Sequence, residues 1–141
     1  MEATPDTQRI AMRHLRVGWW ALLFYLALGL VLEVLHGYKV AAYLDVGMET
    51  RRLMWRLAHA HGTLLALVNV AYGLTARAVP AAARGALGSW CMLGALVLIP
   101  VGFFAGGIGV HGGDPGLGVF VVPMGAVALG VGVASIARSM R

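Results

Sequence analysis

Four long apolar stretches dominate the sequence and limit it to one class of fold. They cover residues 17–36, 57–76, 86–108 and 117–137. Each is close to the roughly 20 residues that a helix needs to cross about 30 Å of hydrocarbon. Only 12% of the residues are charged, against about 25% in an ordinary soluble domain. We therefore predict one all-α domain over residues 1–141, a polytopic membrane protein folded as a four-transmembrane-helix bundle.

The segments outside these stretches are short. An N-terminal arm, a middle segment over residues 38–56 and two turns are too small to enclose a soluble core. The mixture of apolar and polar residues in the middle segment predicts a turn or a short helix at the membrane interface. From Thr50, which is a suitable N-cap residue, the helical pattern continues into the second apolar stretch. The first stretch is longer than the apolar part of a signal peptide, so we expect an uncleaved anchor. Any chemistry must therefore lie within the bundle or at its rim.

The basic residues predict how the chain is oriented. Four of the eleven Lys and Arg residues would lie on one side of the membrane, at Lys39, Arg51, Arg52 and Arg56. The other seven would lie on the side of both termini, at Arg9, Arg13, Arg16, Arg77, Arg84, Arg138 and Arg141. The positive-inside rule then predicts cytoplasmic termini in a bacterial inner membrane. Lipid headgroups account for these charges, so we expect the bilayer and no nucleic acid as a partner.

Most of the histidines would meet at the side opposite the termini. Helices that alternate in direction bring His36, His59, His61 and His111 to that side, together with Glu33 and Asp114. His14 is the fifth histidine, and we expect it on the other side as a neighbour of the headgroups.

Helical spacing suggests which of these side chains face a neighbouring helix. Glu33 and His36 are three residues apart and share a face with Gly29, which would let another helix come close. His59 lies on the small and polar face of its helix. His61 is about 200° away from His59, on a face typical of lipid contact, so we expect it near the interface or an adjacent helix.

The second half of the chain is rich in glycine and suited to close helix packing. Gly102 and Gly106 form a G-x-x-x-G motif, and Ala128 with Gly132 forms a second pair of small residues. We expect such faces to support a homo-oligomer or a larger membrane complex. Two prolines, at positions 100 and 123, predict kinks, and Asp114-Pro115 predicts the turn between the last two helices.

The segment WRLAHAHGTLLAL, residues 55–67, resembles the haem-ligating second helix of haem-copper oxidase subunit I and of related small haem-binding membrane proteins. The resemblance covers one helix of four, and the chain lacks the copper-ligand histidines of that family. It implies that His59 or His61 is an axial haem ligand, with His36 or His111 opposite.

We accordingly expect a haem- or metal-binding component of electron transfer. The expected cofactor is haem b, held by His36, His59, His61 or His111, with Arg52 or its neighbours Arg51 and Arg56 near the haem propionates. The alternatives are a transition metal on Glu33, His36 and His59, or no cofactor. Two other functions fit the same sequence: an accessory subunit of a larger membrane complex, and a small transporter of protons or solutes. No P-loop, Cys-x-x-Cys or His-Glu-x-x-His motif is present, so we expect no catalytic residues of a hydrolase.

Overall fold

The regular structure consists of helices. A computed structural model describes residues 4–44, 47 and 49–141 of the chain. Its elements are α1 (Pro5–Gly37), α2 (Ala41–Leu44), α3 (Glu49–Ala78), η2 (Pro80–Ala83), α4 (Ala86–Ile108), η3 (Leu117–Phe120) and α5 (Val121–Ser139). Four helical segments are long and apolar enough to cross a membrane: α1, α3, α4 and η3 with α5. The predicted all-α, four-helix architecture is confirmed, and it indicates an integral membrane protein.

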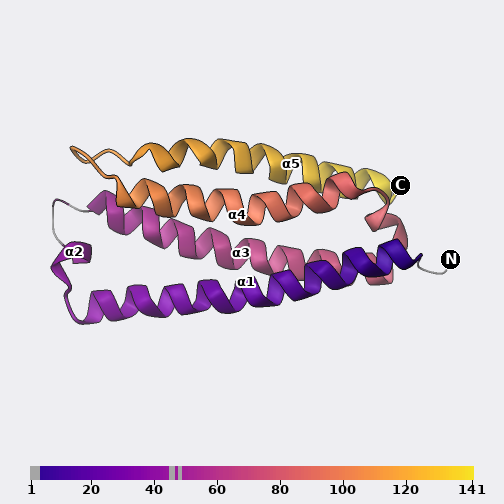
Figure 1. Cartoon of the computed structure of the whole chain (residues 1–141), viewed down its shortest axis with the longest axis horizontal. Helices are drawn as coiled ribbons and strands as arrows, with labels where there is room; N and C mark the ends of the chain where they lie inside the picture. The colour runs from indigo at the N-terminus through magenta and orange to yellow at the C-terminus, as the bar shows by residue number, and fades with distance from the viewer. Residues whose placement is uncertain (1–3, 45–46, 48) are drawn as a thin grey trace.

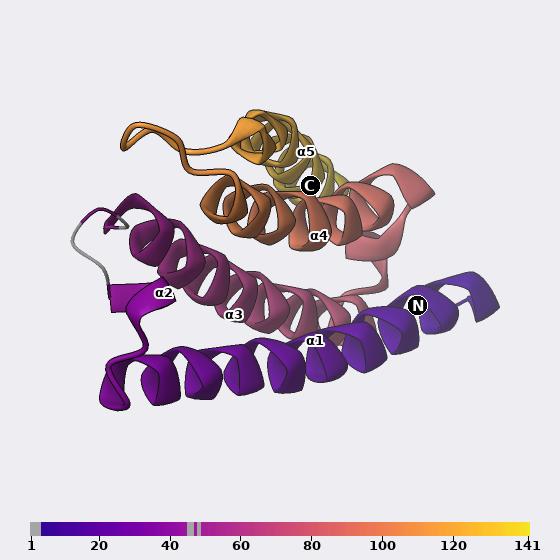
Figure 2. The same ribbon diagram turned by 60° about the vertical axis from the view of Figure 1, so that its left-hand side comes forward.

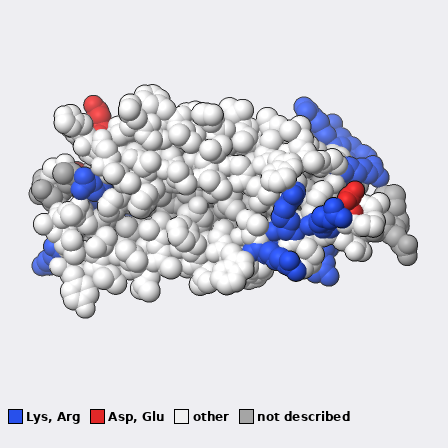
Figure 3. Space-filling view, viewed as in Figure 1, with Lys and Arg blue, Asp and Glu red and all other residues white. Residues whose placement is uncertain are grey.

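The long helices pack in the order of the chain. α1 lies on α3, α3 on α4 and α4 on α5, while α1 and α5 occupy the two outer positions (Figures 1 and 2). Both termini lie at one end of the molecule, with η2, and we call this the terminal end. The opposite end holds α2 and the 109–116 hairpin, and we call it the α2 end. Lys and Arg gather mainly at the terminal end, and the middle of the visible face lacks charge (Figure 3).

The helix α1 begins about three turns earlier than predicted. Thr4 caps it, since its hydroxyl accepts a hydrogen bond from the Thr7 N–H at 3.3 Å, and Pro5 and Asp6 follow in the first turn, where both residue types are favoured. The expected N-terminal arm was therefore wrong. The N-terminal part of α1 is polar in composition, but one of its faces carries small residues that are buried against the end of α3. The predicted continuation from Thr50 into the second stretch is confirmed, because α3 begins at Glu49.

Glycines let α1 and α3 touch backbone to backbone near the terminal end. A Cβ atom added to Gly18 would lie 3.0 Å from the backbone oxygen of Ala66, and one added to Gly73 would lie 3.0 Å from the backbone oxygen of Ala11. Real Cβ atoms rarely come so close, so larger residues at these sites would push the helices apart. Beyond this crossing the two helices diverge toward the α2 end (Figure 2).

The glycine motif of α4 packs as predicted, against the start of the last helix. A Cβ on Gly102 would lie 3.1 Å from the backbone nitrogen of Val122. Pro123 lies just after the junction of η3 with α5. One prediction about this region was wrong. The hairpin turns at Gly112 and Gly113, with φ of 58° and 93°, and not at Asp114-Pro115, because two consecutive positive φ angles favour glycine.

Replacing Gly18 with alanine tests the close crossing. We expect Gly18→Ala to destabilise the protein by about 1–3 kcal/mol, because the new methyl group meets backbone atoms that cannot rotate away. Gly94→Ala is the matched control, since no atom lies within 4 Å of a Cβ built there. Unfolding in mild detergent, followed by circular dichroism, measures both. Equal stability of the two variants would contradict the packing described here.

Candidate functional site

The divergence of α1 and α3 opens a groove at the α2 end, which we call the α1–α3 groove. Its volume is about 1030 Å³. One wall is the α1 face that carries Gly29, Glu33 and His36, and the other is the α3 face that carries Arg52 and His59. The helix α2 closes the groove through Tyr43. Four of the residues predicted to hold a cofactor or metal therefore share one cavity, which helix periodicity alone did not guarantee.

His59 is held against α1 in one orientation. Its Nδ1 atom lies 2.8 Å from the backbone oxygen of Tyr25. A carbonyl oxygen can only accept, so Nδ1 carries the proton and Nε2 carries the lone pair. The ring lies against Gly29, where a Cβ would come within 2.4 Å of the ring carbon Cε1. Gly29 was predicted to let a neighbouring helix come close, but the atoms nearest to it belong to the His59 imidazole and not to a backbone.

Glu33 and His36 lie further along α1, toward the mouth of the groove. Both are exposed, and Glu33 has no ion-pair partner among the described residues. His36 is seven residues beyond Gly29, which is about 10 Å along a helix. Among residues 4–44, 47 and 49–141, no three His, Cys, Asp or Glu side chains are grouped so that they could hold a metal ion. Glu33, His36 and His59 thus line one groove without forming the predicted three-ligand cluster.

Two arginines face the groove and a third does not. Arg52 forms an ion pair with Glu49 at 3.6 Å and lines the groove, as does the exposed Arg56. Arg51 points to the other side of α3, where its Nε atom donates to the backbone oxygen of Gly107 at 3.1 Å. Arg52 and Arg56 are therefore the side chains placed to meet an anionic group in the groove.

Aromatic rings fix α2 over the end of the groove. Tyr43 stacks on Trp55 with ring centroids 6.2 Å apart, and Trp55 stacks on Phe104 at 5.4 Å. Burial raises the pKa of the Tyr43 phenol, while Arg56 and Arg52 lower it and Glu33 raises it. The phenol therefore stays protonated at neutral pH and can donate a hydrogen bond.

The other two predicted histidines lie outside the α1–α3 groove. The His61 ring packs on Phe103 of α4, with centroids 4.8 Å apart, and its Nδ1 atom donates to the backbone oxygen of Leu57 at 2.9 Å. The face of α3 that carries His61 was predicted to be of the lipid-facing kind, and this was wrong, because Leu65 and Tyr72 on it are buried against the bundle. His111 is exposed in the hairpin, paired with Asp114 through backbone hydrogen bonds.

His14 is a buried residue whose position was predicted wrongly. It is fully buried, whereas the sequence pattern placed it among lipid headgroups. Its Nδ1 atom lies 2.7 Å from Asn69 Oδ1 on α3, and its Nε2 atom lies 2.7 Å from Ser89 Oγ on α4. The Tyr72 ring meets it edge to face at 4.5 Å. A signal for this site was available in the sequence, since Thr7, Ala11, His14 and Gly18 repeat at helical spacing.

These contacts form one directed chain of hydrogen bonds. Asn69 donates through Nδ2 to the backbone oxygen of Leu65 at 2.8 Å, so its Oδ1 atom accepts from the Nδ1–H of His14. The neutral ring then accepts at Nε2 from the Ser89 hydroxyl, which itself accepts from Arg13. Both ring nitrogens of His14 therefore have a partner, and the chain joins three helices toward the terminal end.

Replacing His14 with leucine tests the role of this chain. We expect His14→Leu to destabilise the protein by about 1–3 kcal/mol, because Asn69 and Ser89 each lose a buried hydrogen-bond partner. His111→Leu removes an exposed histidine from the hairpin and should leave stability unchanged. Unfolding in detergent compares the two variants. A His14→Leu protein as stable as the parent would show that the chain does not hold the helices together.

Comparisons with known proteins offer no guide to the function of these sites. No protein-family model, no curated protein sequence and no solved structure matches this chain. The function must therefore be argued from the geometry of the α1–α3 groove and of the buried histidine at the other end.

Proposed function

We propose that this chain is a membrane redox protein that binds haem b in the α1–α3 groove, where His59 would hold the iron. One observation carries the proposal: the Nδ1–H of His59 is occupied by the Tyr25 carbonyl at 2.8 Å, and the ring lines the groove. A histidine whose second nitrogen is engaged in this way has a fixed tautomer and a free Nε2 lone pair, as metal-ligating histidines usually do.

The remaining lining of the groove suits an amphipathic cofactor with carboxylates. Its volume of about 1030 Å³ lies at the upper end of the usual range for ligand sites. Leu26, Leu32 and Leu57 supply apolar walls. Arg52 and Arg56 lie near the membrane surface, where charge-assisted hydrogen bonds to propionates are favourable. His36 is the second histidine of the groove and would be the other candidate to hold the iron.

The residues of the groove would have distinct roles in such a protein. Bound haem supplies one-electron transfer. His59 would hold the iron, its hydrogen bond to the Tyr25 carbonyl keeps the ring in place, and Arg52 and Arg56 would meet the propionates. The site lies at the α2 end, and the basic residues of the terminal end favour a cytoplasmic location for both termini. The groove would then exchange electrons at the external face of the membrane.

The structure gives less support to the other functions considered. For a transporter, the α1–α3 groove and the His14 chain would need a polar connection. Between them lies an apolar core cluster that includes Tyr25, Leu65 and Ile99. For an accessory subunit, α5 offers a surface, because Gly125 and Gly132 are its buried residues while Met124, Val127 and Val133 are exposed. An accessory role is thus the second candidate, and co-purification of larger subunits in mild detergent would favour it.

The absorption spectrum of the purified protein tests the haem proposal. Protein produced in cells supplied with haem should show a Soret band when oxidised and sharp α and β bands after reduction with dithionite. His59→Gln should lose most of the haem, because the amide can still donate to the Tyr25 carbonyl but cannot replace imidazole as a ligand. His111→Gln is the matched control and should keep the full spectrum.

Two outcomes would contradict the proposal. One is a colourless preparation of folded parent protein from haem-supplied cells. The other is a His59→Gln spectrum identical to that of the parent, since the iron would then be bound elsewhere. The unfolding midpoint of each variant, measured on the same samples, separates loss of ligation from loss of fold.

A further inference from the structure

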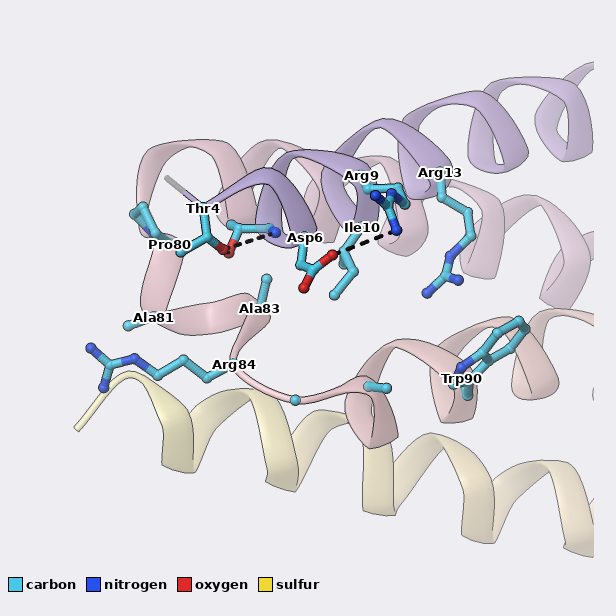
Figure 4. Close-up of a pocket in the computed structure, with 13 residues that line it drawn as sticks. Thr4, Asp6, Arg9, Ile10, Arg13, Pro80, Ala81, Ala83, Arg84 and Trp90 are labelled. Carbon is cyan, nitrogen blue, oxygen red and sulfur yellow. Dashed lines mark hydrogen bonds and ion pairs between the residues drawn. The ribbon is translucent and has the colours of Figure 1, made fainter. Parts of the chain in front are cut away.

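A second cavity lies at the terminal end, far from the α1–α3 groove. It has a volume of about 510 Å³ and is formed by the first turns of α1, by η2 and by the start of α4 (Figure 4). Three arginines line it, Arg9, Arg13 and Arg84, against one carboxylate, that of Asp6. We call it the arginine pocket. Its charged side chains are thus mainly positive, and Ile10, Pro80 and several alanines supply an apolar wall.

The single carboxylate does not neutralise the arginine pocket. Asp6 lies 3.5 Å from Arg9, but both side chains are more than three-quarters exposed, at 84% and 80%. Exposed ion pairs of this kind are weak and exchange readily with other partners. The Arg84 side chain has no hydrogen-bond or ion-pair partner among the described residues. The guanidinium groups of Arg9 and Arg84 are thus available to bind an anion.

Arg13 is held in place at the back of the pocket. It donates to the Ser89 hydroxyl and lies over the Trp90 ring, 4.4 Å from the ring centre. Its Nε atom is buried and has no hydrogen-bond partner. The Arg13 guanidinium is therefore only partly satisfied by the protein, and Arg13 lines the pocket.

The start of α4 adds further donors to the same pocket. Gly85 precedes the helix with φ of 88° and supplies no side-chain cap. The first N–H groups of a helix have no intrahelical partner and favour negative charge. Gly85 and Ala86 both line the pocket, so the start of α4 borders the same cavity as the arginines.

The position of the pocket indicates where its ligand comes from. Trp90 lines it and is 59% exposed, as expected for an aromatic ring at the membrane surface. The basic residues of the terminal end lie beside the uncharged middle of the molecule, at the level where headgroups begin (Figure 3). We propose that the arginine pocket binds the phosphate of an anionic phospholipid headgroup, with Arg9 and Arg13 on one side of the pocket and Arg84 at its outer edge (Figure 4).

Titration of short-chain lipids into the detergent-solubilised protein tests this proposal. Phosphatidylglycerol should bind more tightly than phosphatidylcholine. The double variant Arg9→Gln/Arg84→Gln should weaken phosphatidylglycerol binding about 30-fold, since each arginine near a headgroup contributes about fivefold. Both residues are exposed and neither contacts the His14 chain, so the fold should persist. The unfolding midpoint of the variant verifies this.

A second double variant serves as the control, because it also removes two positive charges from the terminal end. Arg16→Gln/Arg77→Gln changes two arginines outside the arginine pocket and should weaken binding less than about threefold. Equal losses in both double variants would overturn the proposal, because binding would then reflect general surface charge. Inorganic phosphate forms the last arm of the experiment. Full competition by phosphate, at an affinity equal to that of the lipid, would identify a site for free anions and would also overturn it.

Discussion

The close crossing of α1 and α3 is the contact on which the rest of the structure depends. Gly18 and Gly73 bring the two backbones together near the terminal end. Rigid helices that touch at one end and cross at an angle must separate at the other, and the separation forms the α1–α3 groove. Gly29 continues the same face of α1 and leaves room for an imidazole in place of a backbone. Three glycines thus decide both where the helices meet and where the His59 ring has space.

The polar residues of the bundle are divided into two groups by an apolar centre. His59, Arg52 and Arg56 lie at the α2 end, while His14, Asn69 and Ser89 lie toward the terminal end. A buried polar group is tolerated only when its hydrogen bonds are made, and the two histidines meet this requirement differently. His14 uses both ring nitrogens within the protein and acts as a structural link. His59 uses one and keeps the other available, which is the reason it carries the proposed function.

Periodicity predicted which residues share a helix face, but it did not predict what each face meets. The face of His61 was taken for a lipid contact because leucine, valine and methionine suit lipid and protein interiors equally. In the structure Phe103 of α4 covers it. His14 was assigned to the headgroups because arginines flank it, yet a helix places neighbours in sequence about 100° apart, so an exposed Arg and a buried His can be adjacent. The burial of a side chain depends on the partner helix, and spacing alone does not identify that partner.

The sequence by itself determined the all-α class, the four membrane-spanning segments, the bounds of α4 and the gathering of four histidines at one end. These follow from local properties: the length of apolar runs, the alternation of helix direction, and caps and breakers at helix ends. Only the tertiary structure decided that His59 and His36 share a groove, that His61 and His111 do not, and that His14 joins three helices. The physical reason is that side-chain environments arise from contacts between residues far apart in the chain. Those contacts depend on the order and crossing of the helices.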